Sequence, residues 1–527
     1  MSSNSSLRFG PRAWLAILLV LMCAAAIRVR LRETPLERDE GEYAYSGQLM
    51  LQGIPPYRLA SNMKLPGTYA GYALLMALFG ESIAGIHLGL LLVNGATIVL
   101  IALLGKRLFG TTAGLAACAV YALMSVGEGV LGTQAHATHF VVLAAIGGVL
   151  LLQRYADSHR AALLFVSGLL CGIAFVMKQQ GVFFGLFGLF WLIATERRQR
   201  NLMRRLTIFA GAMALPIAIT CLLLWHAGVF SRFWFWVFTY ARAYVSELSI
   251  SSGFELFIST FTPILRENAA LWVIAGLGLA RIWWEVAPVA SSDASRHERE
   301  RKAWFATVFL IFSFLAVCPG FYFRQHYFVL LLPAIALLAG AAIREPLTVG
   351  ILAIALFISV LTQREFLFRM TPLEASRELY GSNPFPEAIP IADYIRAHSQ
   401  RNARIAVIGS EPEIYFYADR HSATSYIYMY SLMEPQPYAL AMQEDMIREV
   451  TAAAPEFVVE VGGNDSWLRR AASPTRIFDW WAGYRAQHYR EVGIADITDD
   501  GTEYRWNAAA EAYQPQSDSY LAVYRRK

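Results

Sequence analysis

The stretch RDEGEYAYSGQLMLQGIPPYR, residues 38–58, is strongly polar although it directly follows an apolar segment. It contains two adjacent carboxylates, Asp39 and Glu40, a third acidic residue two positions later, three tyrosines and a Pro-Pro pair. Polar and aromatic residues that follow an apolar span are typical of the boundary between membrane and water. We therefore expect residues 38–58 to form a polar loop at a membrane surface.

The composition of the whole chain predicts an integral membrane protein. Of its 527 residues, 56% are hydrophobic and only 16% are charged, and the mean hydropathy is +0.40. The net charge of +5 is small and its basic residues lie in short clusters between apolar runs, so we interpret them as topology signals and exclude nucleic-acid binding. All five cysteines lie within or beside apolar segments, which argues against a disulfide framework or a cysteine metal site.

Apolar runs of about 20 residues predict membrane-spanning helices. We expect about eleven, giving a polytopic α-helical membrane protein, near residues 13–31, 83–104, 111–128, 137–153, 161–178, 181–195, 206–226, 267–284, 303–318, 327–343 and 347–361. The short segment 67–79 is interpreted as an interfacial helix. With the basic residues Arg8 and Arg12 on the cytoplasmic side, eleven spans place the later basic clusters there too, and a twelfth would reverse them.

This topology predicts two domains, with the polar segment 32–82 on the outer face. Residues 1–365 would form the transmembrane domain, with 32–82 as its first outer loop, and 366–527 an outer soluble domain. In the second part, 386–400 has a helical pattern while 404–409 and 456–462 resemble buried strands, so we expect a small α/β domain. The aromatic segment 230–244 is typical of an interfacial belt, with a gating loop over a lipid site as the alternative.

Residues of the first outer loop suit a reaction that releases a phosphate group. A carboxylate such as Asp39 can accept the proton of an attacking hydroxyl, with Glu40 as the second candidate. Arg58 and Lys64 follow in the same loop, and both side chains bind phosphate oxygens and stabilise the departing negative charge. A solvated acidic turn is the alternative structural interpretation.

Other ionisable residues are predicted on the same side of the membrane. Lys178 ends the fifth span, and Arg324 and His326 precede the tenth, although charged residues at helix ends also occur simply as snorkelling side chains. His136 and His139 have the i, i+3 spacing of one helix face. With a nearby carboxylate they would be candidate ligands for a divalent metal ion, the one cofactor we consider, and structural histidines are the alternative.

Four motifs together resemble the GT-C class of membrane glycosyltransferases. They are RDEGEYAYSGQLMLQGIPPY, KLPG before the short segment 67–79, GIAFVMKQQG and RQHYFVLLLPAIALLAG. The similarity is to bacterial transferases that include protein mannosyltransferase-like enzymes and the aminoarabinose and galacturonic acid transferases of lipopolysaccharide. It covers about residues 13–345 and extends into residues 409–428.

The resemblance implies an inverting glycosyltransferase of the bacterial inner membrane. Its polyprenyl-phosphate-linked sugar would be transferred on the periplasmic side to a hydroxyl of a glycolipid, polysaccharide or protein. The acidic first loop of the family implies Asp39 as general base, with Glu40 second. The family's basic positions near the donor phosphate correspond to Lys64 and, less closely, to Lys178, Arg324 and His326. Many relatives have KPP where this chain has KLPG, a difference beside Lys64.

Two other classes of function fit the same composition. A polytopic transporter or lipid flippase would use intramembrane charges as a pathway, although transporters usually show internal repeats and none is evident here. An assembly scaffold would use its soluble domain to bind a partner protein. Substitution of Asp39 by Asn separates these classes, because only a glycosyltransferase would lose sugar transfer.

Overall fold

The computed structural model describes residues 9–286 and 293–527. These residues divide into two compact units, each built from several segments of the chain. The first unit comprises the residues up to Arg32 together with His87–Thr220 and Leu248–Met370, and the second comprises Glu33–Ile86, Cys221–Glu247 and Thr371–Lys527. Arg8, which we used above to orient the chain, lies outside the described residues.

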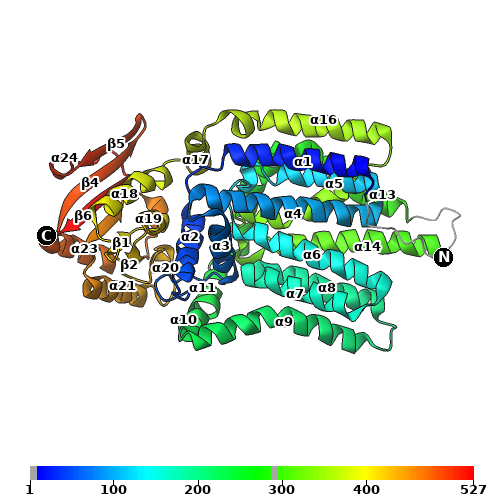
Figure 1. Cartoon of the computed structure of the whole chain (residues 1–527), viewed down its shortest axis with the longest axis horizontal. Helices are drawn as coiled ribbons and strands as arrows, with labels where there is room; N and C mark the ends of the chain where they lie inside the picture. Colours follow the sequence, from blue (N-terminus) through cyan, green and yellow to red (C-terminus); the bar gives the residue numbers. More distant parts are fainter. Residues whose placement is uncertain (1–8, 287–292) are drawn as a thin grey trace. The chain divides into compact units, whose positions relative to one another are not determined.

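The first unit is a bundle of helices (Figure 1). Two of them, α4 and α9, extend a few residues beyond it. Its α-helices are α1 (Pro11–Arg30), α4 (Ile83–Phe109), α5 (Thr111–Met124), α6 (Ala137–Ser158), α7 (Ala161–Met177), α8 (Val182–Glu196), α9 (Leu202–His226), α12 (Ile250–Glu267), α13 (Ala269–Trp284), α14 (Asp293–Leu315), α15 (Leu332–Ala342) and α16 (Pro346–Thr362). Short helical turns lie between some of them: η1 (Glu128–Val130), η2 (Gln179–Gly181), η4 (Pro319–Phe321) and η5 (Gln325–Leu330). A π-helical turn, η6 (Glu365–Arg369), follows α16.

Each of the eleven segments predicted to span a membrane coincides with one of these helices. Among the described residues, four helices, α1, α4, α6 and α9, are long and apolar enough to cross a membrane, or up to five if one bent pair of helices counts as a single span. Several of the other helices are shorter, such as α7 with 17 residues. The structure thus confirms a chain rich in apolar helices, and the number of spans stays a prediction.

Small residues allow the central helices of this bundle to pack closely. A Cβ atom added to Gly278 of α13 would lie 1.9 Å from the carbonyl oxygen of Leu338, and one added to Gly340 of α15 would lie 2.4 Å from that of Ala113. The backbones of α13, α15 and α5 therefore touch, as is usual where small residues line an interface between apolar helices. Nearly every residue of α15 is buried, so this helix lies at the centre of the bundle.

The second unit contains a pair of helices, α2 (Arg38–Leu51) and α3 (Gly67–Phe79), that lie side by side (Figure 1). Helix α3 has the bounds predicted for the interfacial helix. Much of the stretch 38–58, by contrast, is helix where we expected a polar loop. Its polar residues and glycines suggested a loop, but they serve tight packing: a Cβ on Gly47 would lie 2.9 Å from the backbone nitrogen of Ala73 in α3.

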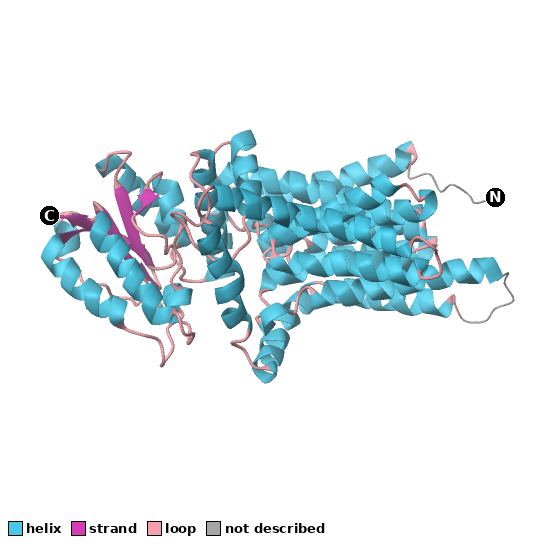
Figure 2. Ribbon diagram, turned by 90° about the horizontal axis from the view of Figure 1, so that it is seen from below, coloured by secondary structure: helices cyan, strands magenta, loops and turns pink. Residues whose placement is uncertain are grey.

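A six-stranded mixed sheet organises the rest of this unit (magenta in Figure 2). The strand order is β2-β1-β3-β6-β4-β5; β1 is parallel to β2 and β3, and the pairs β3–β6, β6–β4 and β4–β5 are antiparallel. The strands are β1 (Arg404–Ile408), β2 (His421–Ser422), β3 (Phe457–Val461), β4 (Tyr489–Thr498), β5 (Gly501–Trp506) and β6 (Tyr520–Arg526). Strands β1 and β3 are the two that the sequence predicts.

Helices pack on both faces of the sheet. Met446 of α21 (Ala439–Ala453) and Trp481 of α23 (Arg476–His488) share a core with Val458 of β3. Tyr394 of α18 (Phe385–His398) contacts the ring of Phe457, whose side chain points to the opposite face because residues alternate along a strand. Shorter helices of this unit are α17 (Pro372–Tyr380), α19 (Glu413–Ala418), α20 (Tyr430–Met433), α22 (Asn464–Trp467) and α24 (Ala508–Glu511).

The aromatic segment 230–244 is helical and belongs to the second unit. It forms α10 (Phe230–Trp234), a π-helical turn η3 (Phe235–Tyr240) and α11 (Ala241–Val245). Trp236 and Tyr240 are buried in the same core as residues of β1 and β3, whereas Trp234 and Phe238 are exposed. Part of the segment is therefore core of the α/β structure, which an interfacial belt alone does not explain.

Candidate active site

The N-terminus of α2 holds Asp39 and Glu40 in its first turn. Glu37 is the N-cap residue: its side chain accepts a hydrogen bond from the Glu40 backbone nitrogen at 3.0 Å, and the Glu40 carboxylate accepts one from the Glu37 nitrogen at 3.4 Å. This capping box satisfies backbone groups that a helix start leaves open. Glu40 is fully buried, so the structure gives it a role in capping the helix, while the Asp39 side chain retains 17% exposure.

Asp39 and Glu42 share the ammonium group of Lys64. The Lys64 Nζ lies 2.6 Å from Asp39 Oδ1 and 2.7 Å from Glu42 Oε2. Both acidic residues lie on one face of α2 because they are three positions apart. Burial lowers the pKa of Lys64, but the two carboxylates outweigh this and hold its pKa well above the usual value, so the ammonium is charged at neutral pH.

Glu42 is a buried anchor of this cluster that we did not predict from the sequence. Besides Lys64, its carboxylate accepts hydrogen bonds from Asn62 Nδ2 at 2.6 Å and from the Tyr69 hydroxyl at 2.5 Å. Burial raises the pKa of Glu42 and Lys64 opposes this, with a net rise above the usual value. Its spacing of three residues from Asp39 was the available signal, and it became informative only once 38–51 was known to be helical.

Tyr428 brings the α/β part of the unit into contact with Asp39. Its hydroxyl lies 3.3 Å from Asp39 Oδ1, the same oxygen that Lys64 contacts. The Lys64 Nζ also lies 5.2 Å from the centroid of the Tyr428 ring and 4.7 Å from that of Tyr43, within the range of cation–π attraction. We predicted no functional residue beyond 366, so Tyr428 was missed.

Arg58, the other cation predicted in this segment, makes different contacts. Its guanidinium donates to the carbonyl oxygen of Ala227 at 3.2 Å, and Arg232 donates to its backbone oxygen, also at 3.2 Å. Arg58 is exposed, whereas Asp39, Glu42 and Lys64 are largely buried. We refer to these last three residues as the Asp39 cluster: two carboxylates around one ammonium group.

The remaining predicted residues belong to the first unit. Lys178, the residue after α7, lies with its Nζ 3.2 Å from His326 Nε2 and 4.2 Å from the centroid of the Tyr327 ring. The ring of His326 stacks on that of His136 with centroids 4.0 Å apart. Lys178, His326 and His136 therefore come together from three elements that are distant in the sequence.

Arg324 and His139 lie beside this group without making the same contacts. Arg324 is exposed, and its guanidinium carbon lies 5.6 Å from the centroid of the Tyr322 ring. His139 is buried in the first turn of α6, one turn after His136, which is the N-cap residue of that helix. His136 precedes the helix as its N-cap residue, so only His139 lies within α6.

Comparison with known proteins points to one class of membrane enzyme. Residues 66–225 match the family model described as dolichyl-phosphate-mannose-protein mannosyltransferase. Over 341 residues, the chain is 27% identical to the undecaprenyl phosphate-alpha-4-amino-4-deoxy-L-arabinose arabinosyl transferase of Pseudomonas aeruginosa (strain UCBPP-PA14). This alignment covers 59% of the present chain and 56% of the relative, so the chain spans little more than half the length of that protein.

Solved structures match over almost the whole chain. ArnT from Cupriavidus metallidurans, bound to undecaprenyl phosphate, has a TM-score of 0.62 at 16% identity, with 98% of each chain covered. The chain has the fold of a GT-C glycosyltransferase. Within the same class of fold, the archaeal oligosaccharyltransferase AglB from Archaeoglobus fulgidus, in complex with an inhibitory peptide and a dolichol-phosphate, has a TM-score of 0.52 at 11% identity, covering 96% of this chain and 75% of that one.

These matches confirm the resemblance that the sequence motifs predict. The GT-C fold and the apolar helices identify a multi-pass membrane protein. At these identities the solved structures carry the fold alone, so the roles of individual residues rest on the geometry described above.

Proposed function

We propose that the chain is an inverting glycosyltransferase that takes a sugar from a polyprenyl-phosphate donor. The observation that carries this proposal is the Asp39 cluster, in which a partly exposed carboxylate is held by Lys64 at 2.6 Å. The relatives support the class of donor, since one is named as an undecaprenyl phosphate-linked arabinosyl transferase and a solved neighbour was bound to undecaprenyl phosphate. The sugar and the acceptor are not assigned.

In the proposed reaction Asp39 is the general base. Its carboxylate accepts the proton of an acceptor hydroxyl, whose oxygen forms a bond to the anomeric carbon while the bond from that carbon to the phosphate oxygen breaks. The electron pair leaves with the polyprenyl phosphate. One displacement inverts the anomeric centre, and it needs no second carboxylate as nucleophile.

Lys178, Arg324 and His326 are our proposal for the groups that bind the donor phosphate. The contacts of Lys64 support this division, because its ammonium group is already held by two carboxylates, whereas Lys and Arg side chains bind phosphate oxygens by charge-assisted hydrogen bonds. Lys178 and Arg324 bring positive charge, and Lys178 Nζ lies 3.2 Å from His326 Nε2, so the ammonium and the imidazole are already close together. Lys64 would then orient the base and oppose charge as the phosphate departs.

The proposal also includes an orientation. We infer a location in the bacterial inner membrane, with the second unit and its Asp39 cluster on the periplasmic side. The basic residues Lys106 and Arg107 in the last turn of α4 support this, because Lys and Arg are enriched on the cytoplasmic side of spans. Acceptors available there are envelope glycolipids, polysaccharides and proteins.

A bacterial strain that lacks the gene for this chain provides the test. Its lipids would accumulate the unused donor, and its envelope would lack one sugar. Lipid extract from this strain serves as donor and its membranes serve as acceptor, with purified chain added; mass analysis then measures the sugar transferred. Transfer by the wild-type chain supports the proposal. Restored transport of an intact glycolipid without any new glycosidic bond would instead support the flippase alternative.

A divalent metal ion held by His136 and His139 is a separate proposal. Both imidazoles are buried at the N-terminal end of α6, one turn apart, a spacing that lets two histidines bind one ion. Treatment of the purified chain with EDTA should then abolish transfer, and added Mn²⁺ or Mg²⁺ should restore it in the wild type but not in His139→Ala. Unchanged transfer in EDTA would contradict the proposal.

A further inference from the structure

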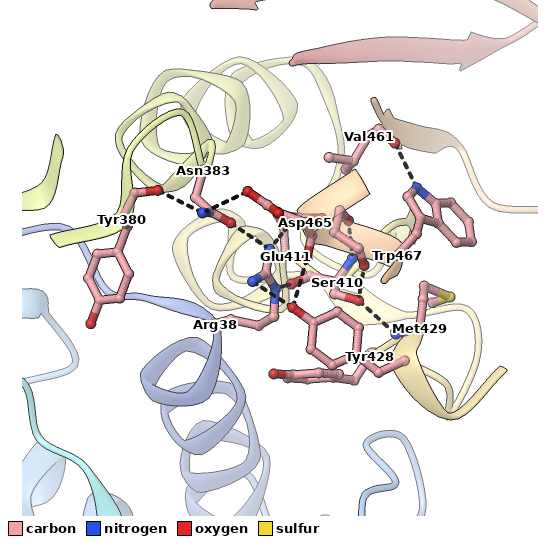
Figure 3. A network of polar contacts seen from close by, with 12 residues as sticks. Arg38, Tyr380, Asn383, Ser410, Glu411, Tyr428, Met429, Val461, Asp465 and Trp467 are labelled. Carbon is pink, nitrogen blue, oxygen red and sulfur yellow. Dashed lines mark hydrogen bonds and ion pairs between the residues drawn. The ribbon is translucent and has the colours of Figure 1, made fainter. Parts of the chain in front are cut away.

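We propose that Arg38 is a positioning residue through which the six-stranded sheet fixes the general base. This inference rests on the proposed function of Asp39, the next residue in the chain. Arg38 donates from Nε to the Ser410 carbonyl oxygen at 2.6 Å and from Nη2 to Glu411 Oε1 at 2.9 Å (Figure 3). Its other contacts are to Asn383 Oδ1 at 3.1 Å and to the Tyr430 hydroxyl at 2.9 Å.

These contacts tie the start of α2 to the carboxyl end of the parallel strand β1. Ser410 and Glu411 follow β1 after one glycine, and Ser466 of α22 contacts both of them. The Ser466 Oγ accepts from the Ser410 nitrogen at 2.8 Å and donates to Glu411 Oε2 at 2.8 Å. Arg38 is 7% exposed and Glu411 is fully buried. Ser410 and Glu411 are thus held by contacts that do not involve Arg38.

Ser410 fixes both residues of the contact between Asp39 and Tyr428. Its carbonyl oxygen accepts from Arg38, the neighbour of Asp39, and its Oγ accepts from the backbone nitrogen of Met429, the neighbour of Tyr428, at 2.8 Å (Figure 3). One residue at the end of β1 therefore sets the positions of two chain segments that meet at Asp39 Oδ1.

Close packing of α2 leaves this anchor little freedom. A Cβ on Gly41 would lie 2.6 Å from the backbone nitrogen of Glu413, so α2 touches the backbone of α19 one turn after its start. The planar guanidinium of Arg38 also lies over the rings of Phe385 and Tyr430, with centroids at 5.2 and 5.5 Å. Lysine would keep the charge but could not reproduce this fork of hydrogen bonds.

Buried ion pairs of this kind often specify geometry and add little net stability. A displacement of a catalytic group by about 1 Å can lower a rate by about a hundredfold. If Arg38 positions Asp39, its loss should therefore reduce the turnover of bound substrate and leave the affinity for the donor nearly unchanged.

The test is Arg38→Lys, with Arg485→Lys as matched control. Arg485 also joins a glutamate and a tyrosine of the second unit, with Glu460 at 2.6 Å and the Tyr524 hydroxyl at 3.0 Å. Among the described residues, these partners lie on β3 and β6 and not on α2. Rates of transfer are measured at increasing amounts of donor lipid extract. Each rate is divided by the amount of folded protein, which thermal unfolding measures. Ser410→Ala is measured beside them; it removes the hydroxyl that accepts from the Met429 nitrogen and donates to the Ser466 carbonyl oxygen, and it keeps the backbone contact to Arg38.

For Arg38→Lys we expect the maximal rate to fall about tenfold to a hundredfold with the apparent KM for the extract changed less than about threefold. Arg485→Lys should retain both values. Ser410→Ala should lower the maximal rate in the same way, which keeps the test decisive if Arg38→Lys does not fold. A wild-type maximal rate in the folded variants, or an equal loss in Arg485→Lys, would overturn the inference.

Asp39→Asn separates this inference from the proposed function. If Asp39→Asn is inactive while Arg38→Lys and Ser410→Ala turn over at the wild-type rate, only the positioning role of Arg38 is wrong. If Asp39→Asn itself transfers sugar at the wild-type rate, the assignment of the base is wrong, and the positioning role is overturned with it.

Discussion

Lys64 and Asp39 form an ion pair of 2.6 Å although they are separated by 25 positions in the sequence. The same ammonium lies 2.7 Å from Glu42, so Lys64 joins the segment before α3 to the first two turns of α2. Burial lowers the pKa of Lys64, but the two carboxylates raise it by more. The ammonium therefore stays charged throughout the physiological pH range, and the ion pair persists. It is the feature on which the proposed chemistry depends.

Lys64→Ala should have a much larger effect than Arg58→Ala. Removal of Lys64 takes away the ammonium group that both carboxylates contact, so we expect sugar transfer to fall at least about a hundredfold. Arg58 is exposed and contacts a backbone carbonyl, so its replacement should leave transfer within about threefold of wild type. Comparable losses in the two variants, measured with donor extract, would assign Arg58 to the donor site instead.

Glu42→Gln tests the role of the buried anchor. In this variant the negative charge of Glu42 is gone, and Asp39 alone faces the ammonium of Lys64. The ionised form of Asp39 is then more stable, so Asp39 is a weaker base. Transfer should therefore fall about tenfold or more. The control is Glu81→Gln, an exposed carboxylate that accepts a hydrogen bond from Gln48 at 3.1 Å and should tolerate the change. Equal activity in the two variants would remove Glu42 from the mechanism.

Glu413→Gln should make stability less dependent on pH. Burial, aided by the neighbouring charge of Glu411, holds the pKa of Glu413 well above its usual value. The folded state therefore binds this proton more tightly than the unfolded state does, and Glu413 destabilises the fold progressively as the pH rises above about 4.3. Thermal unfolding at pH 5 and pH 8 should show a smaller drop in Tm for Glu413→Gln than for wild type. A drop as large as in the wild type would show that Glu413 is ionised in the fold.

Hydropathy made the helical part of the fold predictable. Every predicted span coincides with a helix, and 67–79 has the bounds of α3, because apolar runs limited by glycine and charge are strong local signals. Strands β1 and β3 were predictable for the same reason. Strands β4 and β5 were not, since their polar and charged residues become strand only through pairing with each other and, for β4, with β6.

The site was only partly predictable. Asp39 and Lys64 were found from residue type and resemblance, and the structure joins them. Glu42 and Tyr428 were missed for different reasons: the first depends on α2 being a helix, and the second on a contact across 389 residues of sequence. Hydrophobic periodicity carries no information about such distant contacts. It also does not show that residues 33–86 and 221–247 belong to the same unit as the residues after Met370.

The most direct test of the central claim is the transfer rate of Asp39→Asn, measured with donor extract and deletion-strain membranes. Amide replacement preserves shape but removes the proton acceptor, so we expect a loss of at least about a hundredfold with the fold retained. Glu40→Gln, which changes a helix cap, should lower Tm and leave the transfer rate per folded chain close to that of the wild type. Wild-type transfer by Asp39→Asn, and by the double variant with Glu40→Gln, would contradict the account.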